Sequence, residues 1–407
     1  MFDETETLLR RLGPALTTKH IAELVKTGIS EPTARKRVQR GTAHYQKLAG
    51  IRFEKNTRFI YRPEDYGDVK FWNNLEEAFY THGKSYWAAL VNLRARGGAC
   101  LKERFAQISG APSARKRQLS PDAILERLTA INLLEETVEG DQTYLKLKPF
   151  HLRTAPIEVI RATELAEFVA LHGIKEWARR LGFGSYNQFN MRGEDKAPVV
   201  SGITFDLSAP AYFRPLLQIL DGVAKQGFFA CDINLHGIIE EDEVEAFVRK
   251  CDGAAFSNNV GRIMPMLVAD VFSAKGLDLA KRKGILAITL ENLFGAELAK
   301  ALRDLVSLLT NAGATASVNP EHLMHVMRTL SKIEGASANL RGALFELVVG
   351  SLVKDVEGGY LKTGQKLLEM GTGRKAEVDV QLDKEDNKGF LVIECKAKNP
   401  GARVSEQ

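Results

Sequence analysis

The residues with the clearest chemical potential lie late in the sequence, on two short stretches rich in β-branched residues. Ala376–Leu382 carries Asp379, and Phe390–Lys398 carries Glu394 and Lys396. A polar turn separates the two stretches, which predicts a β-hairpin whose alternate side chains share one face. Carboxylates on an apolar strand are costly unless a partner or a cation compensates them. Mg²⁺ takes such oxygen ligands, and the bound ion activates water and polarises a phosphoryl oxygen, so the pattern indicates phosphodiester hydrolysis.

An apolar helix expected over Arg341–Gly350 adds a further carboxylate, Glu346. Asp379, followed in the next strand by Glu394-Cys395-Lys396, resembles the PD-(D/E)XK nuclease superfamily, especially its Mrr-like restriction and repair members. The resemblance covers residues 337–407. It implies that three carboxylates hold Mg²⁺, with Mn²⁺ as an alternative ion: Glu346, Asp379 and Glu394. It also implies that Lys396 is catalytic, beside the attacking water.

The Glu-x-Lys spacing alone is common and is usually a solvated strand face or a cross-strand ion pair. Its combination with an acid in the preceding strand and an acid on an apolar helix is far more specific. The proline of the family name is absent, because Val378 precedes Asp379, a departure that is frequent in the superfamily. A core of this family needs a further helix and strand, and the sequence stops at Gln407, so we expect this core to be incomplete.

Residues 1–67 are expected to form a winged helix. Helices are predicted over Glu4–Leu12, Thr18–Lys26 and Ser30–Arg40, followed by strands over Ile51–Glu54 and Arg58–Tyr61. This order resembles winged-helix DNA-binding domains, which implies double-stranded DNA as a partner. The basic residues expected to meet phosphates and base edges lie on the third helix and the wing: Arg35, Lys36, Arg37, Arg40, Lys55 and Arg58. The alternative is a winged helix used for protein contact, with a solvated basic face.

Residues 68–150 resemble a second winged helix. Its third helix is expected to begin at Ser120-Pro121, because serine caps a helix and proline suits the first turn. Arg115, Lys116 and Arg117 lie in the loop before that helix. The wing is acidic, so a structural or dimerising role is an equal alternative to DNA reading.

A helical connector is expected over residues 151–197, and residues 198–297 alternate strands and helices, which predicts an α/β domain with a mostly parallel sheet. A helix is predicted over Tyr212–Gln226. The strand that holds Cys231 resembles the late acidic strand, with Ala230 at the place of Glu394 and Asp232 at that of Lys396. This indicates a degenerate nuclease-like domain, in which Asp206 and Asp232 are the remaining candidate metal ligands. An unrelated α/β domain is the alternative.

A second helical connector over residues 298–336 would lead into the nuclease-like core at 337–407. The predicted fold class is therefore multidomain, α+β and α/β. It comprises tandem winged helices, a central α/β domain and a C-terminal restriction-endonuclease-like core that is truncated.

Composition sets wider bounds on the protein. A chain of 407 residues with 44% hydrophobic residues suits two to four globular domains, and a net charge of +5 does not by itself imply nucleic acid. The four cysteines lack metal-ligand spacing and no secretory leader precedes them, which favours a cytoplasmic setting. No apolar run reaches transmembrane length, so no membrane partner is expected.

These patterns together predict a metal-dependent DNA endonuclease in restriction or anti-phage defence, with repair as a further role. A homodimer would suit cleavage of both strands. One alternative is a DNA-binding regulator with an inactive nuclease-like domain, and another is a scaffold whose winged helices are protein adaptors. A steep salt dependence of DNA affinity separates the DNA binders from the scaffold.

Overall fold

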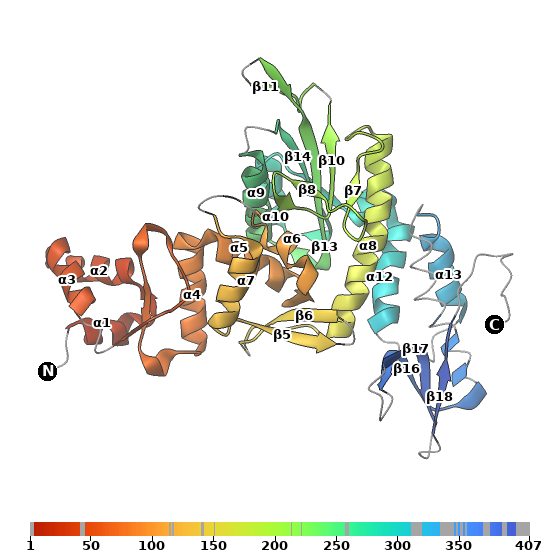
Figure 1. The fold of residues 1–407 in the computed structure, drawn as a ribbon, viewed down its shortest axis with the longest axis horizontal. Coiled ribbons are helices and arrows are strands. Elements are labelled where there is room, and N and C mark those ends of the chain that lie inside the picture. The colour runs from red at the N-terminus through yellow and green to blue at the C-terminus, as the bar shows by residue number, and fades with distance from the viewer. Residues whose placement is uncertain are drawn as a thin grey trace.

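The computed structural model describes residues 4–40, 45–113, 115, 118–139, 142–149, 151–212, 214–220, 222–256, 260–310 and 320–333, and later 346, 349–350, 353–354, 356–368, 375–384 and 389–395. The architecture is mixed α/β, with several small sheets and one larger one. Groups of elements follow one another along the long axis, from the red N-terminal helices to the blue C-terminal strands (Figure 1). The predicted mixture of helices and sheets is confirmed at this level. None of the described helices is long and apolar enough to cross a bilayer.

The first group of elements, residues 4–61, packs three helices against a small sheet. Its elements are α1 (Glu4–Leu12), β1 (Ala15–Leu16), α2 (Thr17–Lys26), α3 (Glu31–Arg40), β2 (Gln46–Lys47) and β3 (Phe59–Tyr61). The antiparallel sheet has the order β1-β3-β2. Each helix turns an apolar stripe inward, and these stripes form a core with Leu9, Leu24, Val38 and Ile60. The three helices expected here are confirmed.

The turn between β2 and β3 differs from the prediction. Gln46–Lys47 pairs with β3, so the strand predicted over Ile51–Glu54 is wrong. Ile51 and Phe53 are buried in the core, and this segment packs against it instead of pairing with a neighbouring strand. A 3₁₀ turn (Glu54–Asn56) follows, in which Lys55 and Asn56 have left-handed φ angles of 55° and 56°.

His20 on α2 is fully buried, and neither of its ring nitrogens has a hydrogen-bond partner. Burial, assisted by the charge of Lys19, lowers the pKa of His20 to about 4. The unfolded chain binds a proton near its ordinary pKa of about 6.5, so stability is full above that pH and is lost as the pH falls towards 4.

We therefore expect His20→Leu to remove part of the acid sensitivity of folding. Between pH 7 and pH 5 the wild type should lose about 2 kcal/mol more free energy of unfolding than the variant, because only the wild type has this proton to bind when unfolded. Urea unfolding followed by circular dichroism at the two pH values measures the difference. Equal losses in the two proteins would show that His20 is not held neutral in the fold.

The second group of elements repeats the chain order of the first. After α4 (Val69–His82) come α5 (Lys84–Ala95), β4 (Ala99–Leu101), the 3₁₀ turn η4 (Lys102–Arg104), α6 (Phe105–Ser109), α7 (Pro121–Ala130), β5 (Leu134–Glu139) and β6 (Gln142–Leu147). The sheet order β4-β6-β5 matches β1-β3-β2, with the last strand in the centre. The cap predicted for α7 is confirmed, because the Ser120 hydroxyl accepts the Ala123 N–H.

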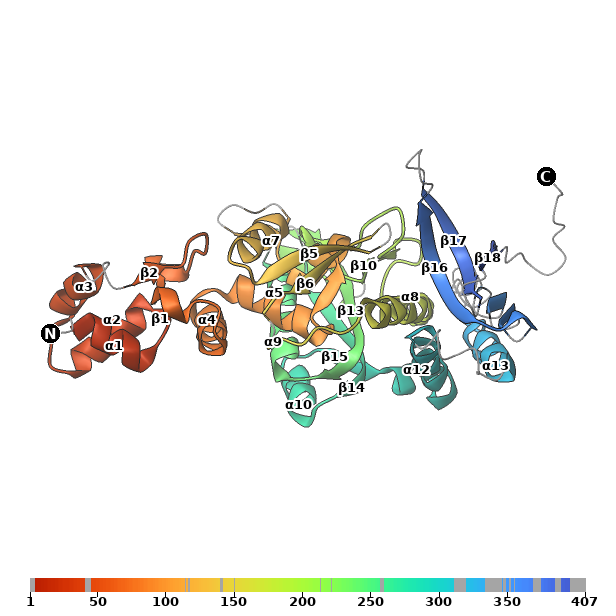
Figure 2. The ribbon, with the colours of Figure 1, turned by 90° about the horizontal axis from the view of Figure 1, so that it is seen from below.

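The central group contains the larger sheet. Its elements are α8 (Ile157–Arg180), β7 (Asn190–Met191), β8 (Val199–Val200), β9 (Ile203–Thr204), β10 (Leu207–Ala211), β11 (Gln218–Leu220), β12 (Val223–Lys225), β13 (Gly227–Ile239), α9 (Glu241–Ala255), β14 (Ile263–Phe272), α10 (Ala274–Arg282), β15 (Leu286–Thr289) and α11 (Leu290–Phe294). The five-stranded sheet has the order β15-β14-β13-β10-β7. Helix α8 packs against one face and α9 and α10 cover the other, as the two separate apolar cores show (Figure 2).

Two predictions for this group are wrong. The sheet is mixed, since β13, β14 and β15 are parallel while β10 pairs antiparallel with both β13 and β7. The helix predicted over Tyr212–Gln226 is instead the β11–β12 hairpin, in which Leu220 pairs with Val223. Gly222 lies in its turn with φ of 75°, a backbone conformation that favours glycine over a helix-forming residue.

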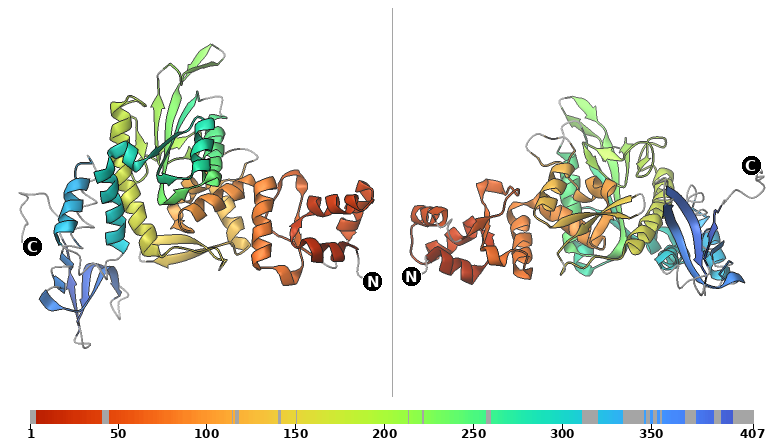
Figure 3. Two further views of the ribbon diagram at one scale, coloured as in Figure 1. Left: turned by 180° about the vertical axis from the view of Figure 1, so that it is seen from behind. Right: turned by 60° about the horizontal axis from the view of Figure 1, so that its bottom comes forward.

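The last elements are α12 (Ala296–Thr310), α13 (Pro320–Leu330) and the strands β16 (Tyr360–Leu368), β17 (Lys375–Asp383) and β18 (Phe390–Ile393). Helices α12 and α13 extend the α8 side of the central core (Figure 3). The late sheet is an antiparallel meander, β16-β17-β18. The hairpin predicted from the acidic residues is confirmed, and β16 is an additional strand that the prediction lacked. The predicted loop at residues 311–315 lies outside the described residues.

Candidate functional site

The late hairpin places two of the predicted acids opposite each other. Val380 pairs with Ile393, so continuing the antiparallel register by one residue sets Asp379 against Glu394. Directly opposed residues in an antiparallel pair point to the same face of the sheet. The Cys395 backbone N–H donates to Asp379 Oδ2 at 2.5 Å, which fixes that carboxylate at the end of β18.

The pKa of the Cys395 thiol is affected by the acidic residues near the end of β18. Burial, reinforced by the charges of Asp379, Glu346 and Glu394, raises the pKa of Cys395 to about 11. The charges of all three predicted carboxylates thus contribute to the raised pKa of this thiol. The same shift keeps the thiol protonated at neutral pH, which argues against a cysteine nucleophile here.

The three acids differ in how far their side chains are exposed to solvent. Asp379 and Glu346 are half-buried and Glu394 is exposed, while Lys396 lies outside the described residues. Within the described parts of the chain, no three His, Cys, Asp or Glu side chains are grouped closely enough to hold a metal. Mg²⁺ usually takes only one or two carboxylates and completes its shell with water and substrate phosphate. The donor set of Asp379 and Glu394 fits that requirement.

The central sheet contains the same arrangement a second time. Leu207 pairs with Cys231, so the register continues to Asp206 opposite Asp232. The N–H of the next residue, Ile233, donates to Asp206 Oδ2 at 3.0 Å. The hydrogen bond from the Cys395 N–H to Asp379 is its equivalent in the late hairpin.

The register corrects the expected correspondence between the two strands. Asp232, not Ala230, stands where Glu394 stands, and Asn234 stands where Lys396 stands. The correspondence predicted from the sequence, which sets Ala230 at the place of Glu394, is therefore two residues out of register.

Protein cations occupy this central acidic cluster. Arg104 from η4 contacts Asp206 at 3.0 Å and Glu167 of α8 at 3.2 Å, and it also pairs with Glu164. Arg192 lies 3.0 Å from Glu167. Burial alone would raise the pKa of Glu167, but Arg192 and Arg104 lower it to about 2.

The second acid of the central pair is also paired within the protein. Lys250 of α9 contacts Asp232 Oδ2 at 2.5 Å, and both residues are buried. Asp232 Oδ1 accepts the backbone N–H of Asp206 at 3.0 Å. A metal ion would have to displace Arg104 and Lys250 to reach Asp206 and Asp232. The cluster as described is therefore structural.

The basic residues predicted to bind DNA divide into two sets. A groove of about 700 Å³ between α2, α3 and the β2–β3 turn is lined by Arg35, Lys55 and Arg58. Lys47 of β2 also lines it, a residue that the prediction missed because it placed this strand elsewhere. Arg35 pairs with Glu31 at 2.6 Å within α3. Three of the predicted residues on α3 do not line the groove: Lys36, Arg37 and Arg40.

The second group uses its loop arginine internally. Arg115 donates to the carbonyl of Gly253 at 2.6 Å and to that of Ser201 at 2.9 Å. It therefore ties the loop before α7 to the central group, while Lys116 and Arg117 lie outside the described residues.

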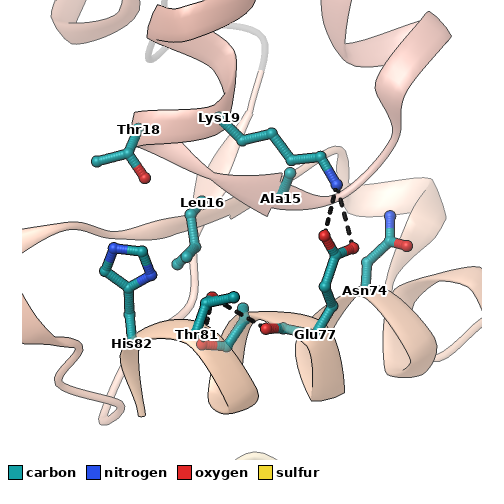
Figure 4. A pocket seen from close by; sticks show the side chains of 9 residues that line it. Ala15, Leu16, Thr18, Lys19, Asn74, Glu77, Thr81 and His82 are labelled. Atoms are coloured by element: carbon teal, nitrogen blue, oxygen red, sulfur yellow. Dashed lines mark hydrogen bonds and ion pairs between the residues drawn. The ribbon is translucent and has the colours of Figure 1, made fainter.

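A smaller pocket of about 290 Å³ lies between α2, β1 and α4 (Figure 4). Lys19 of α2 pairs with Glu77 of α4 at 3.0 Å across one side of it, so its charges compensate each other. Leu16 and Ala15 supply an apolar wall, and His82 stands at the opposite end. This pocket lies where the first group meets α4. Because Lys19 and Glu77 compensate each other, its lining offers no unpaired charge from this pair to a charged ligand.

No protein-family model, curated protein or solved structure matches the chain. The function must therefore be inferred from the residues and their geometry.

Proposed function

We propose that the protein is a metal-dependent nuclease that hydrolyses phosphodiester bonds in DNA, with the β17–β18 hairpin as its active site. The observation that carries this proposal is the end of the β17–β18 register at Val380–Ile393, which brings the next residues, Asp379 and Glu394, together, with the Asp379 carboxylate anchored by the Cys395 N–H. Asp379 is half-buried, where a carboxylate is costly without compensation, and none of the described ion pairs involves Asp379.

Each residue has a role in this proposal. Asp379 and Glu394 would hold Mg²⁺, or Mn²⁺ in its place. Glu346, the third acid predicted from the sequence, is not grouped closely enough with them among the described residues to be a third ligand. The ion would supply an activated water and neutralise charge on the phosphoryl group. Lys396 would orient that water and compensate the charge that develops on the phosphate. The Cys395 N–H holds the Asp379 carboxylate in place at the end of β18, where it would be a ligand of the ion.

The first group would hold double-stranded DNA as a winged helix. Arg35, Lys55 and Arg58 converge on one groove there, and side chains of this kind bind phosphates and position a duplex. The second group would be a structural winged helix, consistent with the internal use of Arg115. The family resemblance suggests restriction or anti-phage defence in the cytoplasm, and a homodimer would allow both strands to be cut.

One observation favours a second candidate, a DNA-binding regulator. The central copy of the acidic pair is filled by Arg104 and Lys250 and has Asn234 in place of lysine. We interpret it as a degenerate nuclease-like domain. If the late hairpin were equally inactive, the protein would bind DNA without cutting it.

The deciding experiment is cleavage of supercoiled plasmid by the purified protein. We expect nicked and linear products with 5 mM Mg²⁺, and none with excess EDTA, because the acids need the ion to act. Intact plasmid under both conditions, together with DNA affinity that falls steeply with salt, would favour the regulator. Intact plasmid with salt-independent or absent DNA affinity would favour a protein scaffold.

A further inference from the structure

A large cleft separates the first group from the central group. Its volume is about 1060 Å³, and its walls come from the β2–β3 turn, the start of α5, the loop before α7 and the end of α9. Helix α5 lies between α7 and α9, so these walls belong to one continuous block (Figure 2).

The lining of this cleft is rich in arginine. It contains Arg52, Arg115, Arg127 and Arg249, against the acids Glu54 and Asp252. Lys84 also lines it but is paired with Glu245 at 2.8 Å. The excess of positive charge favours an anionic ligand.

Three of these arginines donate hydrogen bonds to neutral acceptors, although the charge of Glu54 also acts on Arg249. Arg127 donates to the Tyr86 hydroxyl at 2.9 Å, and Arg249 donates to the Ser85 hydroxyl at 2.9 Å. Arg115 donates to the backbone carbonyls of Ser201 and Gly253. Neutral acceptors orient a guanidinium without cancelling its charge, so the cleft keeps fixed donors for phosphate oxygens.

An aromatic side chain stands at the edge of the same cleft. Phe256 lines it and is 82% exposed, an unusual exposure for a large apolar residue. Basic grooves that carry exposed aromatic rings are typical of single-strand binding, since a base stacks on the ring while arginines follow the phosphates. The cleft volume of about 1060 Å³ lies at the upper end of the range of about 300–1,000 Å³ that is ordinary for ligand sites, and it has room for a few nucleotides.

The cleft also adjoins the groove proposed to hold DNA. Arg52 and Glu54 of the β2–β3 turn line the cleft, while Lys55 and Arg58 of the same turn line the groove. A strand that leaves a duplex held in the groove would therefore reach the cleft by crossing one turn of backbone.

We propose that this cleft binds a short single-stranded segment of nucleic acid, with phosphates on Arg52, Arg127 and Arg249 and a base stacked on Phe256. The proposal rests on the nucleic-acid-binding part of the proposed function and is independent of cleavage.

The test uses fluorescence anisotropy of fluorescein-labelled dT12 with the full-length protein in EDTA, so that cleavage cannot intervene. Arg52→Gln/Arg249→Gln should weaken dT12 binding at least 10-fold. The double substitution should also reduce the slope of log affinity against log salt by about 1.4, because each lost single-strand phosphate contact removes about 0.7. Phe256→Ala should weaken binding at least about 5-fold, since stacking contributes about 1–3 kcal/mol per base.

Two control variants make the result specific. Lys300→Gln removes one positive charge from α12, where the lysine pairs with Asp304 at 2.7 Å, and should change dT12 affinity less than 2-fold. Arg35→Gln/Arg58→Gln alters the groove and should weaken a 12-base-pair duplex more than dT12. Circular dichroism of each variant confirms folding, which is expected because Arg52, Arg249 and Phe256 are exposed.

The possible outcomes separate the cleft proposal from the proposed nuclease function. Unchanged dT12 affinity in both cleft variants would overturn the cleft assignment, while retained duplex binding and plasmid cleavage would leave the proposed function standing. Displacement of dT12 by duplex as effectively as by unlabelled dT12 would overturn the single-strand assignment. If the wild-type protein does not cleave plasmid but the dT12 results are as expected, the nuclease proposal would be wrong and the cleft proposal would stand. Failure of both oligonucleotides to bind would remove the DNA partner and the cleft together.

Discussion

Replacing Asp379 by asparagine is expected to reduce Mg²⁺-dependent DNA cleavage by at least about 1,000-fold, which corresponds to about 4 kcal/mol of activation free energy. Asparagine has almost the same shape, and its amide oxygen can still accept the N–H of Cys395, a bond of 2.5 Å in the wild type. The variant should therefore fold as the wild type does. It loses the negative charge that the proposed ion needs, and a neutral amide oxygen is a much weaker ligand for Mg²⁺. Initial rates of plasmid nicking measure the effect.

A matched control lies on the same strand. Asp383→Asn makes the identical substitution at the far end of β17, where Asp383 Oδ1 accepts from the Gln381 amide at 2.6 Å. We expect cleavage to change less than about 3-fold, equivalent to well under 1 kcal/mol, because this carboxylate is remote from Glu394 along the hairpin. Cleavage that survives in Asp379→Asn would show that the hairpin is not the active site. Equal losses in both variants would point to damage of the sheet instead.

The features that could be predicted from sequence have local signals. Ser120-Pro121 predicts the start of α7, and the structure shows Ser120 as the N-cap. The alternation of apolar and polar residues around Asp379 and Glu394 predicts a hairpin, because the two-residue period of a strand can be recognised within a few residues. The helices of the first group follow from apolar stripes of helical period in the same way.

Short elements with weak or mixed signals were harder to predict. Gln46–Lys47 is too short and too polar to signal a strand. The more apolar Ile51–Glu54 has the stronger strand signal, although its apolar residues pack into the core. In the β11–β12 hairpin the dipeptide Asp221-Gly222 is a recognised turn signal. The apolar residues on both sides of it also fit a helical period, which is why a helix was predicted there.

The central acidic cluster could not be predicted because its partners are distant in sequence. Arg104 and Asp206 are 102 residues apart, and only the docking of the second group onto the central group brings them together. Glu167 carried a usable signal, since it is an acid on an apolar helix upstream of acid-bearing strands, as Glu346 is. Recognising it requires the strand register that sets Asp206 opposite Asp232. The late hairpin is easier to predict because Asp379 and Glu394 belong to consecutive stretches of sequence with a clear strand period.

Replacing Arg104 by methionine is expected to destabilise the protein by about 3–5 kcal/mol at pH 7. Arg104 is 7% exposed and contacts three carboxylates, those of Glu164, Glu167 and Asp206. Methionine fills much of the volume but leaves Glu167 and Asp206 buried with one cation fewer. An uncompensated buried charge costs far more than the lost contact, because water cannot reach it. Urea unfolding followed by circular dichroism measures the loss.

The neighbouring ion pair provides the control for this loss. Lys102 lies on the same 3₁₀ turn and pairs with Glu136 at 2.8 Å, but its side chain is 45% exposed. Lys102→Met should cost only about 0–1 kcal/mol, since solvent screens an exposed pair. Equal and small losses for Lys102→Met and Arg104→Met would mean that the buried network does not form in solution.

A second substitution separates charge from packing at this buried network. Glu167→Gln in the Arg104→Met background removes the unpaired negative charge and leaves Asp206 with Arg192, which lies 3.3 Å away. If uncompensated charge causes the loss, the double variant should be more stable than Arg104→Met alone, although Glu167→Gln in the wild type should be destabilising because it strips Arg104 and Arg192 of a partner. That reversal of sign between the two backgrounds is the signature of a coupled charge pair. A cavity left by the arginine would make the two substitutions add instead.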